Sequence, residues 1–134
     1  MKGQGALSHI RGIVRSRRRP LGSFITSLDP ATTTIMGSAG FDFLVLDAEH
    51  GPIDKGAALA HVRAAQAVDT PVLARVIENS RPLIQSFMDV GVAGVVVPRI
   101  ANAEAAVLAV RATRYGAGGR AHRAREFPSA LARQ

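Results

Sequence analysis

The sequence contains no cysteine and no tryptophan, and its only aromatic residues are five phenylalanines and one tyrosine. Without cysteine the chain cannot form disulfides or thiolate metal sites, which fits a reducing compartment and predicts a cytoplasmic protein. So few aromatic side chains exclude a stacking platform for nucleic-acid bases. No apolar run approaches the roughly 18 residues that a membrane helix needs, so no membrane partner is expected.

Acidic residues are also scarce at both ends of the chain. Residues 1–19 carry six bases and no acid, and residues 111–134 carry six bases and one acid. Residues 20–110, in contrast, hold five bases and nine acids. The overall charge of +7 suggests a polyanionic partner. The excess positive charge lies at the two ends of the chain, however, and the middle is net acidic, which argues against binding of nucleic acid.

The basic start of the chain is typical of an amphipathic helix or of a mitochondrial transit peptide. Leu7, Ile10 and Val14 have the spacing of one apolar helix face, and we favour a basic leading helix over residues 1–19. No apolar segment of a secretory signal follows it. Residues 116–134 are rich in Gly, Ala and Arg without periodicity, which predicts an irregular basic tail.

Residues 20–115 alternate short apolar strands with helices four times. Capping residues mark the helix starts: Asp29 with Pro30, Asp54, Asn79 or Ser80, and Asn102. The periodicity predicts buried faces formed by Ala58, Leu59, Val62 and Ala65, and by Ala103, Ala106, Val107 and Val110. The predicted strands cover residues 21–26, 41–46, 71–76 and 94–98.

Strands that alternate with helices imply an α/β fold with a parallel sheet covered by helices. Two architectures fit four such units. One is a small doubly wound sheet, and the other is a partial (βα)8 TIM barrel, which takes about 250 residues when complete. The composition does not choose between them.

Three predicted strand ends carry polar residues, and ligands of α/β sheets bind at this edge. The densest group, Asp47, Glu49 and His50, follows the second strand. Histidine can act as a general base near neutral pH, and the carboxylates can orient it. Alternatively, all three are ordinary loop or capping residues. The fourth strand ends at Pro98 and Arg99.

Arg75 lies at the end of the third strand, where a guanidinium can hold a carboxylate in a bidentate fork or form a structural ion pair with Glu49 or Glu78. Asp89 lies near a helix end, where the helix dipole disfavours a negative charge. It is either a solvated residue or the partner of an imidazole. His61 is expected on the surface beside Arg63.

Three segments carry a family resemblance: GFDFLVLDAEHGP (Gly40–Pro52), PVLARV (Pro71–Val76) and MDVGVAGVVVP (Met88–Pro98). In this order and spacing they resemble the HpcH/HpaI aldolase family. These are the 4-hydroxy-2-oxoheptanedioate and 2-keto-3-deoxy-sugar-acid aldolases, and they are related to citrate lyase β subunits. The resemblance runs from about Leu21 to Tyr115. It covers the N-terminal half of that family's (βα)8 barrel.

This resemblance implies a class II aldolase, in which a divalent metal, Mg or Mn, holds the oxygens of pyruvate. It also implies roles for residues of this chain. His50 resembles the base, Asp89 its hydrogen-bonding partner, and Arg75 the arginine that binds substrate and steadies the developing oxyanion. Glu49 and Asp47 then support these groups. The implied partners are a 2-oxo acid, an aldehyde and further copies of the chain.

The sequence departs from the family in two respects. The Glu and Asp that bind the metal in the family lie on later strands that this chain does not include. After Tyr115 the usual continuation is replaced by Gly116–Arg123, and we hypothesise a truncated or frame-shifted gene. We therefore expect a metal-dependent aldolase fragment that is inactive by itself. The alternatives are a non-catalytic α/β fragment and a basic-tailed interaction module.

Overall fold

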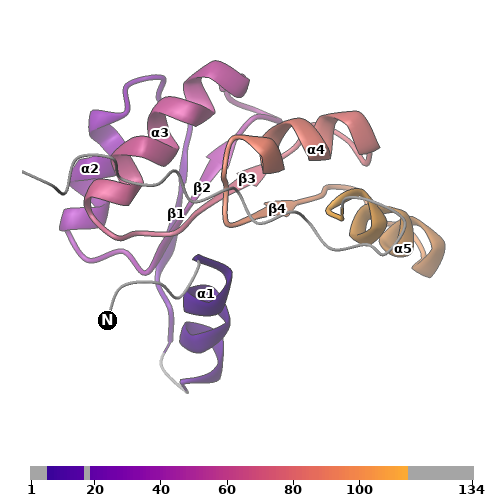
Figure 1. Ribbon diagram of the computed structural model, residues 1–134, viewed down its shortest axis with the longest axis horizontal. Helices are drawn as coiled ribbons and strands as arrows, with labels where there is room; N and C mark the ends of the chain where they lie inside the picture. The colour runs from indigo at the N-terminus through magenta and orange to yellow at the C-terminus, as the bar shows by residue number, and fades with distance from the viewer. Residues whose placement is uncertain (1–5, 17–18, 115–134) are drawn as a thin grey trace, which may run out of the picture.

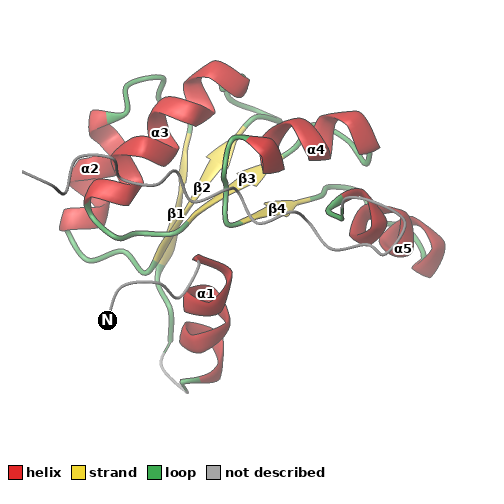
Figure 2. Ribbon diagram, viewed as in Figure 1, coloured by secondary structure: helices red, strands yellow, loops and turns green. Residues whose placement is uncertain are grey.

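The computed structural model describes residues 6–16 and 19–114. These residues form a leading helix followed by four strand–helix units (Figures 1 and 2). The basic tail at 116–134 lies outside the described residues. The elements, in chain order, are α1 (Ala6–Arg15), β1 (Gly22–Ile25), α2 (Ala31–Ser38), β2 (Phe43–Asp47), α3 (Lys55–Ala67), β3 (Val72–Arg75), α4 (Arg81–Asp89), β4 (Gly94–Val96) and α5 (Ala103–Ala112).

The four strands form one parallel sheet in the order β1-β2-β3-β4. A doubly wound sheet reverses its strand order so that helices cover both faces. With right-handed crossovers, an unreversed order places the connecting helices on one face. Figure 1 shows α2, α3 and α4 in such a row, with α1 apart from it. The topology is that of a (βα)8 barrel, so the barrel expectation is confirmed and the doubly wound alternative is wrong.

Three helices start at predicted caps, α3 at Asp54, α4 at Ser80 and α5 at Asn102, and the side chain accepts a capping hydrogen bond at the first and the last of these. Asp54 accepts the N–H of Ala57 at 2.8 Å, and Asn102 accepts that of Ala105 at 2.8 Å. At α2 the N-cap is Pro30, while the Asp29 side chain accepts the N–H of Ala31 at 2.9 Å. Gly40 and Gly91 follow the ends of α2 and α4 with φ of 97° and 96°, where a side chain would be strained.

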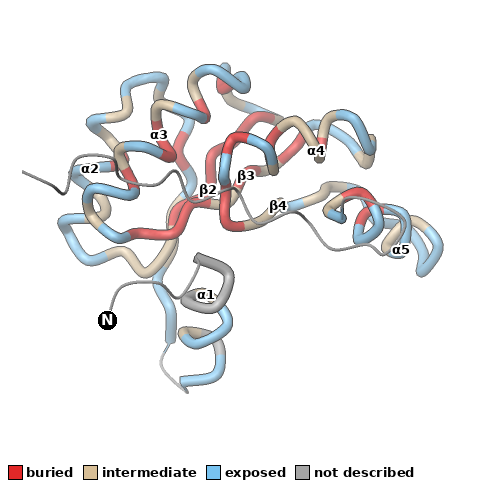
Figure 3. Tube along the Cα trace, viewed as in Figure 1, coloured by how far each residue is buried: buried red, intermediate tan, exposed pale blue. Residues whose placement is uncertain are grey.

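The core lies between the sheet and its row of helices (Figure 3). Every second residue of each strand points toward this core, because successive side chains of a strand lie on opposite faces of the sheet. Among them, Leu44, Leu46 and Ala74 are completely buried. The helices contribute Ala58, Val62, Ala65, Ile84 and Phe87. The opposite face of the sheet is less covered within the described residues, and Phe24 and Val96 there are 53% and 36% exposed.

Two helix-face predictions are wrong. On α3, Leu59 is exposed, whereas His61 is completely buried, because hydrogen bonds from both neighbouring segments satisfy its ring nitrogens. On α5, Ala109 and Ala112 are buried, but Val107 and Val110 are exposed. This helix packs mainly on α4, so most of its apolar side has no partner among the described residues.

None of the helices in the described part of the chain has the length and apolarity that crossing a membrane requires.

Candidate active site

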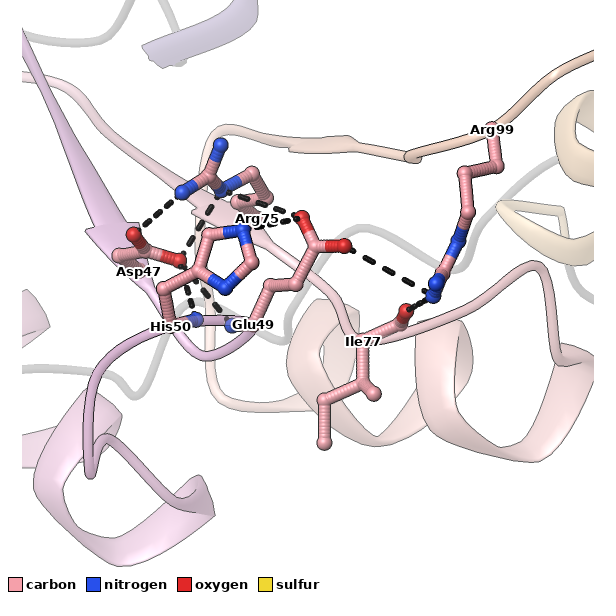
Figure 4. Close-up of polar contacts among 6 residues, drawn as sticks. All are labelled: Asp47, Glu49, His50, Arg75, Ile77 and Arg99. Atoms are coloured by element: carbon pink, nitrogen blue, oxygen red, sulfur yellow. Dashed lines mark hydrogen bonds and ion pairs between the residues drawn. The ribbon is translucent and has the colours of Figure 1, made fainter.

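The carboxyl edge of the sheet gathers the polar residues that follow β2 and β3 (Figure 4). Asp47 ends β2 and Arg75 ends β3, and the parallel register pairs these two residues directly. Because successive residues of a strand point to opposite faces, Asp47 and Arg75 share the face of the sheet that the helices leave uncovered. Parallel pairing therefore brings together residues that lie 28 positions apart in the sequence.

Asp47 holds Arg75 in a bidentate fork. Arg75 donates from Nε to Asp47 Oδ1 at 3.0 Å and from Nη2 to Oδ2 at 2.5 Å. The Asp47 side chain is only 5% exposed. The hydrogen bond from Arg75 holds the pKa of Asp47 below its ordinary value although burial opposes this, and Asp47 in turn raises the pKa of Arg75. Both groups are therefore charged at neutral pH.

The turn after β2 is organised by the same carboxylate. Asp47 Oδ1 accepts the backbone N–H groups of Glu49 at 3.1 Å and of His50 at 3.0 Å. This arrangement is an Asx turn, in which a short acidic side chain fixes the residues that follow it. Asp47 thus places both the guanidinium of Arg75 and the imidazole of His50. The supporting role that the resemblance implies for Asp47 stays a prediction.

Glu49 and His50 extend the cluster from the turn. Glu49 Oε2 lies 3.5 Å from Arg75 Nε and 3.8 Å from His50 Nε2. The His50 side chain is 70% exposed, whereas that of Glu49 is 12% exposed. The exposed imidazole is accessible to a substrate, and the carboxylate beside it can orient the ring.

Two further residues belong to this edge. Arg75 Cζ lies 4.6 Å from the centre of the Phe24 ring, a cation–π contact that holds the guanidinium from the side of β1. Arg99, after β4, donates from Nη2 to the carbonyl of Ile77 at 2.7 Å and lies 3.7 Å from Glu49 Oε1. Sequence reasoning noted Arg99 only as a polar strand end, and it gave no signal for Phe24.

Asp89 is not placed beside His50. After β3 the chain turns at the carboxyl edge, and α4 runs back over its nine residues, about 13 Å, to end at Asp89. Ala93, four residues later, bonds to the carbonyl of Val72 at the start of β3. Asp89 therefore lies toward the amino edge of the sheet, and His50 lies at the carboxyl edge.

The described residues do not fit the divalent metal that the resemblance implies. Residues 6–16 and 19–114 contain no group of three or more His, Asp or Glu side chains placed to hold an ion. Both oxygens of Asp47 accept hydrogen bonds from Arg75, and Glu49 faces two guanidinium groups. The negative charges of both carboxylates are therefore balanced by guanidinium groups of the protein itself. This part of the chain supplies guanidinium and imidazole groups rather than metal ligands.

A barrel-type parallel sheet with charged side chains gathered at its carboxyl edge defines the class of (βα)-barrel proteins, in which active sites lie at this edge. Residues 21–128 match the profile of the HpcH/HpaI aldolase/citrate lyase family, and the chain belongs to that family. The match extends past Tyr115, where the motifs suggested that the resemblance ends.

Individual relatives agree with the family. The chain is 32% identical over 100 residues to a hydroxypyruvate/pyruvate aldolase of Cupriavidus necator, matching 75% of this chain and 37% of that protein. It is 36% identical over 95 residues to a 5-keto-4-deoxy-D-glucarate aldolase of Klebsiella pneumoniae, matching 71% of this chain and 37% of that protein. The chain thus spans less than half the length of these relatives.

A solved structure with the same fold is that of an HpcH/HpaI aldolase from Desulfitobacterium hafniense. It superimposes with a TM-score of 0.75 at 23% sequence identity. The superposition covers 82% of this chain and 43% of that one. This likeness supports the barrel topology of the four strand–helix units.

Proposed function

We propose that this chain carries the base and the oxyanion-binding part of a carbon–carbon lyase site, that of an aldolase which cleaves 4-hydroxy-2-oxo acids to pyruvate and an aldehyde. The observation that carries the proposal is the clamped guanidinium of Arg75 beside the exposed imidazole of His50. Membership of an aldolase family supports it.

In the proposed reaction His50 transfers protons and Arg75 stabilises negative charge. In the cleavage direction His50 accepts the proton of the C4 hydroxyl group, and the C3–C4 bond breaks to release the aldehyde. The electron pair of that bond passes into the pyruvate enolate, whose oxygen Arg75 stabilises with a fixed positive charge. His50 then returns the proton to C3 to give pyruvate. Asp47 fixes Arg75, and Glu49 orients the imidazole.

The metal of this site, Mg or Mn, requires ligands from outside the described residues, because those residues hold no suitable donor set. The proposed role of Asp89 as the hydrogen-bonding partner of His50 likewise requires a second copy of the chain, since α4 carries Asp89 away from the carboxyl edge. A homo-oligomer is therefore part of the proposal. The ligands acted on are a small 2-oxo acid and an aldehyde, and the site of action is cytoplasmic.

The role of His50 is tested by measuring pyruvate release from a 4-hydroxy-2-oxo acid in the presence of Mn²⁺. We expect no release by the 134-residue chain alone. We expect activity when the chain is joined to the part of the Klebsiella aldolase that follows the matched region. In that chimera His50→Ala lowers kcat/KM by about 10²- to 10⁴-fold, the usual contribution of a general base.

An exposed arginine far from the carboxyl edge offers the matched control, because Arg63→Gln in α3 removes a charge without touching the site. It is expected to leave kcat/KM unchanged. An active chimera that keeps its rate after His50→Ala contradicts the base role. His50-dependent release by the unsupplemented chain contradicts the proposal that the site is incomplete.

The open sheet predicts self-association. β1 and β4 each pair with one neighbour only among the described strands, and unpaired strand edges pair readily with other chains. Apolar side chains on α5, including Val107, Leu108 and Val110, are about half exposed. Sedimentation velocity is expected to show concentration-dependent species larger than a monomer. A monodisperse monomer that unfolds cooperatively over the same concentrations contradicts this prediction.

A further inference from the structure

The last described helix, α5, has no following strand to pack on, unlike the other connecting helices. α2 packs against β2, α3 against β3 and α4 against β4, so each of these helices contacts the strand that follows it. α5 packs mainly on α4, and no strand follows β4 within residues 6–16 and 19–114. Val107, Leu108 and Val110 of α5 are about half exposed. The apolar side of α5 therefore lacks a strand and a helix beyond β4.

The exposed apolar side chains are concentrated at the two ends of the sheet. In the described part of the chain eleven large apolar side chains are exposed, and nine of them belong to residues 21–38 and 94–112. These two ranges contain the first and the last strand–helix unit. Leu59 and Ile77, in the middle units, are the other two. Since clustered exposed apolar side chains mark interaction surfaces, the two ends of the sheet are where a partner is expected.

The strand edges at these ends are suited to pairing. β1 (Gly22–Ile25) and β4 (Gly94–Val96) contain no charged residue and no proline, which are the residues that protect exposed strand edges. The four described strands run parallel in the order β1-β2-β3-β4, so the sheet is open beside β1 at one end and beside β4 at the other. A parallel strand beside β4 would continue the strand order of a (βα)8 barrel.

We infer that a second copy of this chain binds at both ends, so that two copies close one barrel of eight strands, four from each copy. A twofold axis parallel to the strands keeps all of them parallel and places β4 of each copy beside β1 of the other. α5 then packs on β1 and α2 of the second copy, where Ile35 is exposed. Because one chain carries both complementary edges, two identical seams form and no edge stays open.

The charges at the carboxyl edge permit this closure. Both copies present that edge at the same end of the barrel, so their polar clusters face each other across its mouth. Each cluster holds two guanidinium groups, of Arg75 and Arg99, and two carboxylates, of Asp47 and Glu49. These charges balance within each copy, and the two clusters therefore do not repel each other strongly.

The closed pair goes beyond the proposed function and leaves the catalytic roles of His50 and Arg75 unchanged. In both copies Asp89 lies toward the amino edge and His50 at the carboxyl edge. A contact between Asp89 of one copy and His50 of another therefore needs an interface other than these two seams.

The experiment is sedimentation velocity of the full 134-residue chain over a range of concentrations. We expect a species with the mass of two chains and none larger, because a closed pair has no open edge. Val107→Lys on α5 and Ile35→Lys on α2 should each raise the dissociation constant about 10- to 100-fold, since an interface hot spot has this effect and each substitution enters both seams. Leu59→Lys, at an exposed position of α3, is the matched control and should leave the pair unchanged.

The absence of cysteine allows the seam itself to be tested. Figure 1 shows α2 and α5 at opposite ends of one copy, so a short bismaleimide can join cysteines on these two helices only between copies. We expect the variant with Ile35→Cys and Val107→Cys to give a covalently linked pair of chains. The variant with Leu59→Cys and Val107→Cys should not be linked, because α3 lies inside the row of helices.

Each contrary outcome overturns the closed pair in a recognisable way. A series of species that grows with concentration shows open edge-to-edge association, and a monomer at every concentration shows that the seams do not form. A pair that both lysine variants leave unchanged, or a cross-link at position 59 as strong as that at position 35, shows that another surface is used. Unfolding curves of the lysine variants confirm that a lost pair does not come from a lost fold. Pyruvate release by the chimera tests the proposed function separately.

Discussion

Asp47→Ala is expected to destabilise the protein by about 3–5 kcal/mol, the cost of breaking a buried ion pair by removing one partner. Asp47 is 3% exposed. Its loss leaves the guanidinium of Arg75 without its fork and the N–H groups of Glu49 and His50 without their acceptor. Because a whole domain is stable by only about 5–15 kcal/mol, this loss is a large fraction of the total, and we expect a large fall in the urea midpoint of unfolding. Circular dichroism with urea titration measures this.

The matched control is Glu78→Ala, since Glu78 is an exposed acid that follows β3 at the same edge. It is expected to change stability by less than about 0.5 kcal/mol. Replacing both members of the pair, Asp47→Leu with Arg75→Met, should cost less than Asp47→Ala alone, because no buried charge is left unpaired. An Asp47→Ala variant as stable as the Glu78 control contradicts the assigned role of the pair.

The ion pair of Asp47 with Arg75 also predicts how the free energy of unfolding changes at acidic pH. The pKa of Asp47 is lowered in the folded state, so the unfolded chain binds a proton more readily as the pH falls. The stabilisation from Asp47 is fully present above about pH 5 and is lost as the pH falls through 3.8 toward the folded pKa. The variant with leucine and methionine in place of the pair should show a shallower loss over this range.

His61→Ala is expected to cost about 2–4 kcal/mol, the sum of a buried cavity and unsatisfied polar groups. The ring is completely buried. Nε2 lies 3.0 Å from the carbonyl of Ser27, which can only accept, so Nε2 carries the proton. Nδ1 then accepts from the hydroxyl of Thr33 at 2.7 Å. The imidazole thus joins α3 to α2 and to the segment that follows β1.

Leu59→Ala is the control on the same helix, and it should cost less than about 1 kcal/mol because Leu59 is exposed. Glutamine at position 61 retains a donor for the carbonyl of Ser27 and is expected to restore part of the lost stability. Urea midpoints of the three variants give the comparison. Equal effects of His61→Ala and Leu59→Ala would show that the hydrogen bonds of His61 contribute nothing.

Burial lowers the pKa of His61, although the carbonyl of Ser27 and the charge of Asp29 oppose the shift. The neutral ring is the form that fits, so its stabilisation is fully present above about pH 6.5 and declines as the pH falls below that value toward the folded pKa. Stability should therefore rise with pH across this window. His61→Gln should flatten the rise, and a rise of unchanged slope contradicts the assignment.

Most of the fold could be predicted from the sequence because its local signals agree. Strand segments such as 43–46 are continuously apolar, as is typical of strands buried in a parallel sheet. Asp54 and Asn102 cap the helices that they precede. The same alternation predicted that the polar residues at the strand ends lie close together, since the carboxyl ends of parallel strands meet at one edge of the sheet. Asp47, Glu49, His50 and Arg75 therefore came together as the alternation predicts.

The remaining features of the fold depend on contacts between residues far apart in the sequence, which the local hydrophobic pattern does not reveal. The sequence by itself determined the alternation of strands and helices, the caps and the residues at the carboxyl edge. Only the tertiary structure decided the strand order, because both barrel and doubly wound sheets use the same elements. It also buried His61, whose partners Ser27 and Thr33 are distant in sequence. Finally, it set Asp89 at the opposite edge from His50, because a helix must run back across the sheet before the next parallel strand begins.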